Sequence, residues 1–144
     1  MTKYLSIEMS KQLFALGAFS GRAFEVGDRV QTGELRVELV TCAKERCLYT
    51  HREDMGVSYA AAKYQCILLP RLDDVLDELG NPDLQWVGQQ NYDDSRVHLC
   101  TAVANQFGKL ITYSATGVTT LEAAAKCLIT ILEAKAEAKQ EVEL

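Results

Sequence analysis

A capped, amphipathic segment near the C-terminus constrains the fold of this chain more than any other part of the sequence. Thr119 and Glu122 have the spacing of a capping box, in which the two side chains bond backbone N–H groups at the start of a helix. Apolar residues follow at the spacing of one helical face: Leu121, Ala125, Leu128 and Leu132. A helix with such a stripe needs an apolar surface to pack on, so we expect a sheet beneath it.

Three strand candidates precede this helix and can supply that surface. They cover three stretches: Leu84–Gln89, Arg96–Asn105 and Lys109–Ser114. Short polar connections join them, which fits an antiparallel meander. In the middle strand two sets of residues alternate: Val97, Leu99, Thr101 and Val103 against Arg96, His98, Cys100 and Ala102. This period of two predicts that one face joins the core and that the other, which carries His98, is at least partly polar.

The chain is expected to begin with a helix. Residues 6–16 carry apolar positions at helical spacing, and Gly17 supplies a C-terminal stop. Between residues 17 and 34 the density of glycine permits only short extended pieces. This stretch therefore opens an irregular β region.

The irregular β region continues with an alternating segment. Leu35, Val37 and Leu39 alternate with Arg36 and Glu38, the pattern of a half-buried strand whose apolar side packs inward. Two further stretches extend the same sheet, and a polar stretch between them is expected to form a loop: residues 47–49 and 64–69, and residues 50–55.

A short acidic helix follows at Pro70, whose fixed φ suits a first helical turn. Its apolar stripe has four members: Leu72, Val75, Leu76 and Leu79. The acidic residues between them face outward. Gly80, Asn81 and Pro82 end the helix, because each disfavours a further helical turn for a different reason.

Length and composition favour one α+β domain. The chain has 144 residues, of which 48% are hydrophobic and 24% charged, the balance of an ordinary globular protein. We expect a single domain over residues 1–134, with an N-terminal helix, an irregular β region, a short helix, a three-stranded antiparallel meander and a C-terminal helix packed on the sheet. Residues 135–144 keep helix-forming residues but lose the apolar stripe, so they form a polar helical extension or a frayed tail.

Apolar segments, cysteine count and net charge indicate where the protein resides and which partners it can bind. The apolar stretches are shorter than the roughly 20 residues that cross a bilayer, and no secretory signal precedes the first helix, so the expected location is the cytoplasm. The chain has 5 cysteines, an odd number that favours reduced, mostly buried thiols over a disulfide framework. A net charge of -5 disfavours nucleic acid as a partner, since gripping phosphates requires a basic face.

Three short motifs stand in residues 69–132. They are the helix start Pro70-Arg71-Leu72-Asp73-Asp74-Val75-Leu76, then Trp86, then Gly117-Val118-Thr119-Thr120-Leu121-Glu122-Ala123-Ala124. In this order they resemble a family of small bacteriophage and prophage proteins without an assigned function, and residues 8–17 are similar to the opening of such proteins. The resemblance implies an accessory protein of a mobile element in the cytoplasm of a bacterial host cell. The resemblance implies no catalytic residue.

Cysteine and histidine residues offer the sharpest chemical hypothesis, a zinc site. Cys42, Cys47 and His51 are close in sequence, and His98 and Cys100 share one strand face. Their spacing lacks the closely spaced ligand pairs that are typical of zinc modules, and free cysteine is typically buried. We therefore expect no metal and no cofactor. Cys100 beside His98 also suggests a nucleophile and its base, but no third group orients them. We therefore expect no catalytic residues and no enzyme activity.

What remains is a recognition surface on the outer face of the meander. Its candidate binding residues are Trp86, Arg96, His98, Tyr92 and Tyr113, with Gln85 beside them. The expected function is noncatalytic binding of a host or phage protein. Two alternatives stay open: binding or sequestering a small ligand such as a nucleotide signal, and RNA binding, since the order helix, three strands, helix is that of a double-stranded RNA-binding domain. A homodimer through the C-terminal helix or a sheet edge is the default for a domain of this size.

Overall fold

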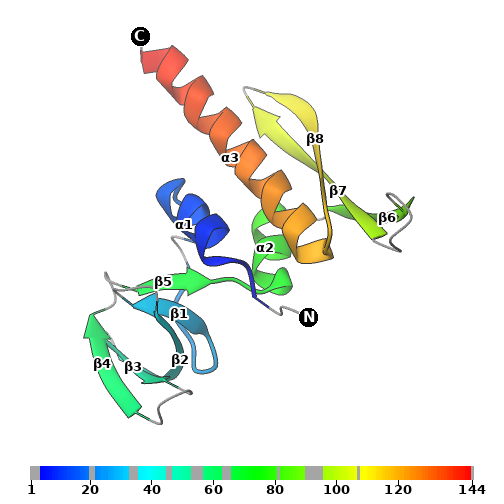
Figure 1. Ribbon diagram of the computed structural model, residues 1–144. Helices are drawn as coiled ribbons and strands as arrows, with labels where there is room; N and C mark the ends of the chain where they lie inside the picture. The colour runs from blue at the N-terminus through cyan, green and yellow to red at the C-terminus, as the bar shows by residue number, and fades with distance from the viewer. Residues whose placement is uncertain are drawn as a thin grey trace.

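The computed structural model describes residues 4–19, 22–32, 36–44, 47–52, 57–62, 66–80, 82–89, 96–106 and 108–143. Within these residues the chain forms three helices and two antiparallel sheets, which confirms the predicted α+β class. Figure 1 shows the two sheets at opposite ends of the molecule, with α1 (Ile7–Ala15) and α2 (Leu72–Leu79) between them and α3 (Thr120–Glu143) lying along the C-terminal sheet.

The two shorter helices form where their sequence signals stand. Ser6 caps α1 by accepting a hydrogen bond from the Met9 N–H at 3.3 Å. Gly17 follows the last turn with a φ of 83°, a conformation that favours glycine. Helix α2 begins two residues after the buried Pro70, and Gly80 ends it with a φ of 84°. Local signals therefore account for the start and the end of both helices.

The start of α3 carries most of the predicted capping box. Thr119 Oγ1 accepts a hydrogen bond from the Glu122 N–H at 3.1 Å, whereas the Glu122 carboxylate accepts one from the Val118 N–H at 3.2 Å, one residue before the expected donor. The helix continues to Glu143, so the polar extension is helical through that residue. None of the described helices combines the length and apolar character needed to cross a membrane.

The predicted irregular β region forms a five-stranded antiparallel sheet, which we name sheet A, with one register shift between Val40 and Cys42. Its strands follow one another along the chain: β1 (Arg29–Thr32), β2 (Arg36–Ala43), β3 (Cys47–Arg52), β4 (Val57–Ala62) and β5 (Cys66–Leu69). The order across the sheet is β4-β3-β2-β1-β5, so β5 returns to pair with β1. Sequence reasoning missed β1 and β4. The loop expected at residues 50–55 was wrong for residues 50–52, which belong to β3, and residues 53–55 lie outside the described residues.

The side of β2 that faces the core is the opposite of the one that its sequence pattern predicts. Val37 is exposed, whereas Glu38 and Val40 are buried. The Glu38 carboxylate accepts hydrogen bonds from Thr32 Oγ1 at 2.7 Å and Thr50 Oγ1 at 2.8 Å, which offsets the cost of burying it. Four residues form the small apolar core of this sheet: Val30, Val40, Leu48 and Cys66.

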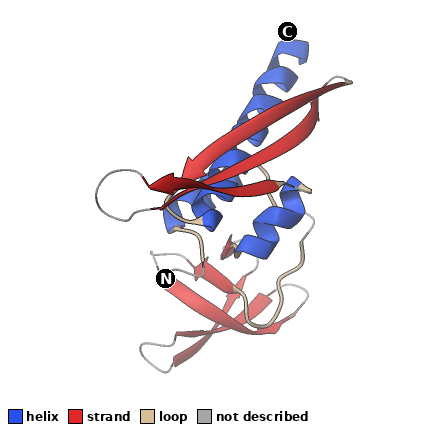
Figure 2. Ribbon diagram, turned by 90° about the vertical axis from the view of Figure 1, so that its right-hand side faces the viewer, coloured by secondary structure: helices blue, strands red, loops and turns tan. Residues whose placement is uncertain are grey.

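The predicted meander forms the second sheet, which we name sheet B. Its strands are β6 (Asp83–Gln89), β7 (Arg96–Gln106) and β8 (Lys109–Gly117), paired antiparallel in the order β6-β7-β8. Helix α3 packs on one face of this sheet, against β7 and β8. Figure 2 shows the β7–β8 hairpin lying across α3.

The face of β7 that packs on α3 carries its small residues. Cys100, Ala102 and Ala104 are buried, whereas Val103 is exposed. The first turns of α3 also carry small, fully buried residues: Ala123, Ala124, Ala125 and Cys127. Of these, Cys127 lies against Cys100 and the Tyr113 carbonyl oxygen of sheet B. Small side chains on both surfaces let the helix approach the sheet closely, and Leu99 and Val103 of β7 face away. The expectation that the His98 side of β7 is the outer, polar side is therefore wrong.

An ion network joins sheet A to α2. The Arg22 guanidinium donates hydrogen bonds to both carboxylate oxygens of Asp28 and to Asp74 of α2, each at 2.9 Å. Burial acts to raise the pKa of Asp28, but the Arg22 guanidinium and the Glu25 backbone N–H outweigh it and lower the pKa below its usual value. Arg22 therefore holds the segment before β1 against α2. Helix α2 in turn packs on α3.

The N-terminal segment is held at the same junction. The Leu5 N–H donates a hydrogen bond to the Pro70 carbonyl oxygen at 3.0 Å. The Tyr4 ring centre lies 4.8 Å from the guanidinium carbon of Arg29 and 5.4 Å from that of Arg71. Hydrogen bonding from Arg29, helped by the charge of Arg71, lowers the pKa of the Tyr4 phenol. These contacts tie the segment before α1 to both sheet A and the start of α2.

Candidate functional site

Two of the predicted binding residues lie on the α3 side of sheet B. His98 is opposite Gly117 in the register of β7 and β8, and its Nδ1 lies 3.1 Å from Thr120 Oγ1 at the start of α3. Tyr113 packs against the core cluster, and its hydroxyl donates a hydrogen bond to Gln106 Oε1 at 3.0 Å. The prediction that His98 and Tyr113 belong to the outer face is therefore wrong, because both side chains are engaged on the helix-covered face.

Of the other three predicted binding residues, the structure describes the backbone of two and leaves the third outside the described residues. Trp86 lies in β6 opposite His98, and Arg96 begins β7 opposite Gln89. The side chains of Trp86 and Arg96 lie outside the part of the chain that the structure describes, as does the whole of Tyr92. Their role in binding stays a prediction.

Cys100, the candidate nucleophile, is sealed between β7 and α3. It is fully buried beside Cys127, whose Sγ lies 3.7 Å from the Tyr113 carbonyl oxygen. Burial, and then the neighbouring Cys127 thiol, raise the pKa of Cys100 to about 12. Because the thiolate is the reactive form, a thiol with this pKa is a poor nucleophile at neutral pH. His98, the candidate base, contacts Thr120.

The candidate zinc ligands of sheet A lie on two neighbouring strands. Cys42 is opposite Tyr49 and His51 is opposite Leu39, while Cys47 begins β3. Across the described ranges of the chain, no group of three or more His, Cys, Asp or Glu side chains is arranged to hold a metal ion. Although Cys42, Cys47 and His51 are close in sequence, the strands do not bring their side chains together as a set of metal ligands.

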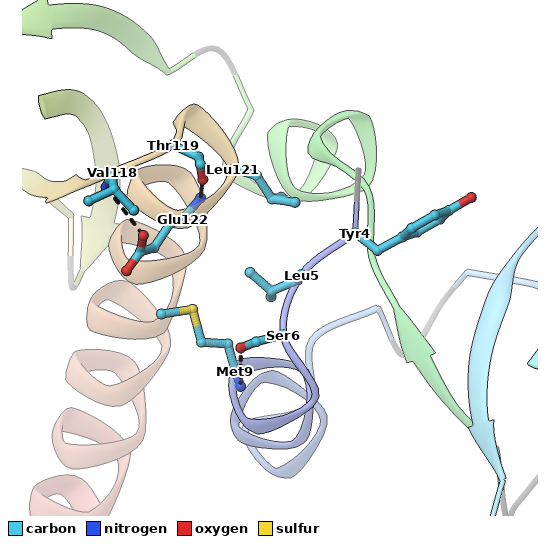
Figure 3. A pocket seen from close by; sticks show the side chains of 8 residues that line it. All are labelled: Tyr4, Leu5, Ser6, Met9, Val118, Thr119, Leu121 and Glu122. Carbon is cyan, nitrogen blue, oxygen red and sulfur yellow. Dashed lines mark hydrogen bonds between the residues drawn. The ribbon is translucent and has the colours of Figure 1, made fainter. Parts of the chain in front are cut away.

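A cavity of about 270 Å³ lies where α1 meets the start of α3 (Figure 3). Its lining comes from both helix N-termini: Tyr4, Leu5, Ser6, Met9, Val118, Thr119, Leu121 and Glu122. In Figure 3 the Met9 side chain points toward α3, and the Tyr4 ring points away from the cavity. Both N-termini are capped within the chain, by Ser6 at α1 and by Thr119 at α3. The cavity is thus lined by apolar side chains and satisfied caps, without a histidine or cysteine.

A second cavity, of about 420 Å³, is acidic. Its lining comes from α2 and from the chain that follows α1: Phe19, Arg22, Glu25, Asp74, Asp77 and Glu78. Arg22, its cation, is already paired with two carboxylates, and Glu25, Asp77 and Glu78 are exposed. This excess of negative charge repels phosphate groups, so the cavity does not suit a nucleotide.

On the face of sheet B opposite α3, most of the described side chains of β7 and β8 are exposed. The described side chains of this face alternate with the buried ones along β7 and β8: Leu99, Thr101, Val103, Asn105, Leu110, Thr112, Ser114 and Thr116. We call this set the outer face of sheet B. None of these residues of β7 and β8 is charged, although 24% of the whole chain is. The exposed Asp83 of β6 is opposite Thr101 and lies beside them on the same face. Val103 is 55% exposed and Leu110 is 75% exposed, and the register makes them diagonal neighbours across the hairpin.

Sequence reasoning missed this surface because it assigned the wrong side of β7 to the core. The relevant signal was present as a run of uncharged alternate residues in β7 and β8. Interpreting that run requires knowing which side the helix covers, and this depends on how α3 packs on β7 and β8.

Comparison with protein-family models, with curated proteins and with solved structures found no match to this chain. The resemblance of residues 69–132 to phage and prophage proteins therefore stays a prediction. The outer face of sheet B is the feature on which a function can be built.

Proposed function

We propose that this chain is a noncatalytic binding protein whose partner, a host or phage protein in the bacterial cytoplasm, docks on the outer face of sheet B. The observation that carries the proposal is the exposure of Val103 and Leu110 on the part of this face formed by β7 and β8, where none of the described side chains is charged. The centres of protein interfaces are depleted of charge, and the solvated faces of antiparallel sheets are typically polar. The phage setting is supported by the motifs at residues 70–76 and 117–124.

Covering the outer face stabilises a complex through its apolar side chains. Fully burying a valine or leucine side chain contributes about 1.5–3 kcal/mol, so covering the exposed parts of Val103 and Leu110 contributes roughly 2–4 kcal/mol together. Thr112 and Thr116 add methyl groups for packing and hydroxyls for hydrogen bonds. A strand face suits a protein partner better than a small ligand, because small-ligand sites are concave and enclose their ligand.

The noncatalytic part of the proposal is supported by the reactive side chains. The Cys100 thiol is buried and its pKa is raised, and His98 is engaged with Thr120. Neither described cavity combines a nucleophile with a positioned base, which acyl or phosphoryl transfer would require.

The test identifies the partner and then compares two valine-to-lysine variants. A photo-crosslinking amino acid at Asn105, on the outer face, captures proteins from a bacterial lysate, and mass spectrometry identifies them. Val103→Lys then places a charge at the centre of this face. Val26→Lys is the matched control, because Val26 is 69% exposed and lies before sheet A, away from sheet B.

Isothermal titration calorimetry of the purified partner decides the outcome. Val103→Lys should weaken binding at least about tenfold, which corresponds to about 1.4 kcal/mol, and Val26→Lys should leave the affinity within about twofold. Equal affinities for the two variants would contradict the proposal. The failure to capture any protein at Asn105 above the level at a solvent-facing position of α3, such as Glu133, would also contradict it.

A further inference from the structure

Strand β8 forms one edge of sheet B, and none of the described strands pairs with its outer side. It is nine residues long, and its register with β7 runs without a break from Lys109 to Gly117. The opposite edge, β6, has a register irregularity between Trp86 and Gln89. Natural edges are protected by charges, prolines, bulges or short length, and β8 has none of these beyond Lys109.

The hairpin decides which backbone groups of β8 face outward. Gln106 and Lys109 are paired with two residues between them, and a connection of this length closes on a pair that exchanges both hydrogen bonds. Such pairs recur at every second residue, so Ile111 and Tyr113 also bond β7. The N–H and C=O groups of the intervening residues point away from β7: Leu110, Thr112, Ser114 and Thr116. Another strand would bind this row of donors and acceptors.

We propose that β8 pairs antiparallel with β8 of a second copy of this chain, around a two-fold axis at Tyr113. This register uses the whole strand, because Lys109 then lies opposite Gly117 of the second copy and Thr112 lies opposite Ser114. The two three-stranded sheets become one continuous sheet. The inference goes beyond the binding function proposed above and does not depend on it, since the outer face stays open on both copies.

The second copy is favoured as the occupant because the sequence of β8 is compatible with itself. Two chains with a net charge of -5 repel each other where acidic surfaces meet, but β8 carries no acidic residue. Lys109 falls opposite Gly117, so no pair across the join brings like charges together. Self-association of an acidic chain needs a neutral surface, and β8 provides one with unpaired backbone groups.

Helix α3 leaves room for the join. It packs on both β7 and β8, and not on β8 alone. If the axis lies midway between the two strands, a strand spacing of about 4.8 Å places the two α3 helices roughly 10 Å apart. That separation is close to the 8–10 Å typical of packed helices. The helices can therefore lie side by side beneath the joined sheet.

The join also covers side chains that a single copy exposes. Ile111 is 38% exposed, and it lies opposite Ala115 of the second copy. Leu110 lies opposite Thr116 on the outer face. The two Tyr113 side chains meet at the axis in a position without cross-strand hydrogen bonds, where side chains approach most closely.

A proline at an outward position tests the backbone pairing. Thr112→Pro removes one outward N–H and leaves the bonds to β7, and Thr112→Ala is the matched control because it keeps that N–H. Sedimentation over a concentration series measures the mass. The wild type and Thr112→Ala should reach twice the 16.0 kDa of one chain. Thr112→Pro should dissociate at least about tenfold more readily, with an unchanged circular dichroism spectrum.

Cysteine pairs test the register and do not require the proline variant to fold. In a background with Cys42→Ser and Cys47→Ser, chains carrying Thr112→Cys are mixed with chains carrying Ser114→Cys. Opposed Cα atoms about 5.5 Å apart permit a disulfide, whereas two copies of either variant alone place their cysteines too far apart. The mixture should give a covalent dimer under mild oxidation by oxidised glutathione, and each variant alone should give much less.

Several outcomes would overturn the inference. The wild type would remain at 16.0 kDa at every concentration, or Thr112→Pro would dimerise as readily as Thr112→Ala. A mixture that cross-links no better than its components would exclude the register centred on Tyr113. If a monomeric chain paired β8 with a strand of a different protein, the second copy would be the wrong occupant. None of these results bears on partner capture at Asn105, so the two proposals can fail separately.

Discussion

Replacing Arg22 with alanine should destabilise the fold, because one guanidinium serves two carboxylates. The side chains are 24% exposed for Arg22, 7% for Asp28 and 14% for Asp74. Removing one partner of a fully buried ion pair costs about 3–5 kcal/mol, since the other charge is left uncompensated. Solvent screening at the partly exposed Arg22 reduces this, so we expect a loss of about 2 kcal/mol in the free energy of unfolding. For a chain of this size the melting temperature should fall by roughly 4–8 °C.

Urea denaturation followed by circular dichroism measures the loss for Arg22→Ala. Lys126→Ala is the control, because Lys126 pairs with Glu122 at 3.1 Å on the surface, where its removal should cost less than about 0.5 kcal/mol. Adding Asp28→Asn to Arg22→Ala should restore part of the loss, since a neutral amide needs no cation. A loss for Arg22→Ala no larger than that for Lys126→Ala would refute the reasoning.

The same contact sets a pH dependence with a definite sign. The pKa of Asp28 is lower in the folded protein than its usual value of 3.8, so the folded state binds this proton less tightly than the unfolded state. The contribution to stability is therefore fully present above the unfolded pKa and is lost as pH falls through the lower, folded pKa. The difference in unfolding free energy between wild type and Arg22→Ala should be constant near neutral pH and shrink below about pH 4. A difference that persists unchanged in acid would contradict this assignment.

Two further predictions concern the packing of α3 on sheet B. Gly117→Ala should cost about 1–3 kcal/mol in urea denaturation, because an added Cβ would lie 2.7 Å from the Ala123 backbone nitrogen. Gly108→Ala, where a Cβ meets nothing within 4 Å, should cost only the roughly 1 kcal/mol of its positive φ, and equal losses would contradict the clash. Cys100 and Cys127 should react with Ellman's reagent only after unfolding, since burial raises the pKa of both thiols; labelling of either in the native protein would show that α3 does not seal them.

The helices could be predicted because their signals are local. Ser6, Gly17 and Thr119 act on backbone groups within a few residues, and the structure places a helix end at each. Strand β1 could not be predicted in the same way, since Arg29–Thr32 is short and without apolar alternation. It is a strand because β2 and β5 bond it from both sides, and β5 is distant in sequence.

The faces of the strands were the main failure of sequence reasoning. Hydrophobic alternation assigns the larger apolar residues to the core, but Glu38 is buried through two threonine hydroxyls and Val103 is exposed. In both strands a contact with another element decided which side is buried: the threonine hydroxyls that bond Glu38 in sheet A, and the packing of α3 on β7 in sheet B. The candidate site depends on those faces, so residues such as His98 were recognised but placed on the wrong side.

Amide hydrogen exchange along β8, followed by NMR at increasing protein concentration, is the most direct test of an open and self-compatible sheet B. In dilute solution the amides of Leu110, Thr112, Ser114 and Thr116 should exchange rapidly, while Ile111 and Tyr113 are protected by their bonds to β7. On concentration the rapidly exchanging set should become protected as the second copy binds. Uniform protection along the strand in dilute solution, or an alternating pattern that does not change with concentration, would contradict the account.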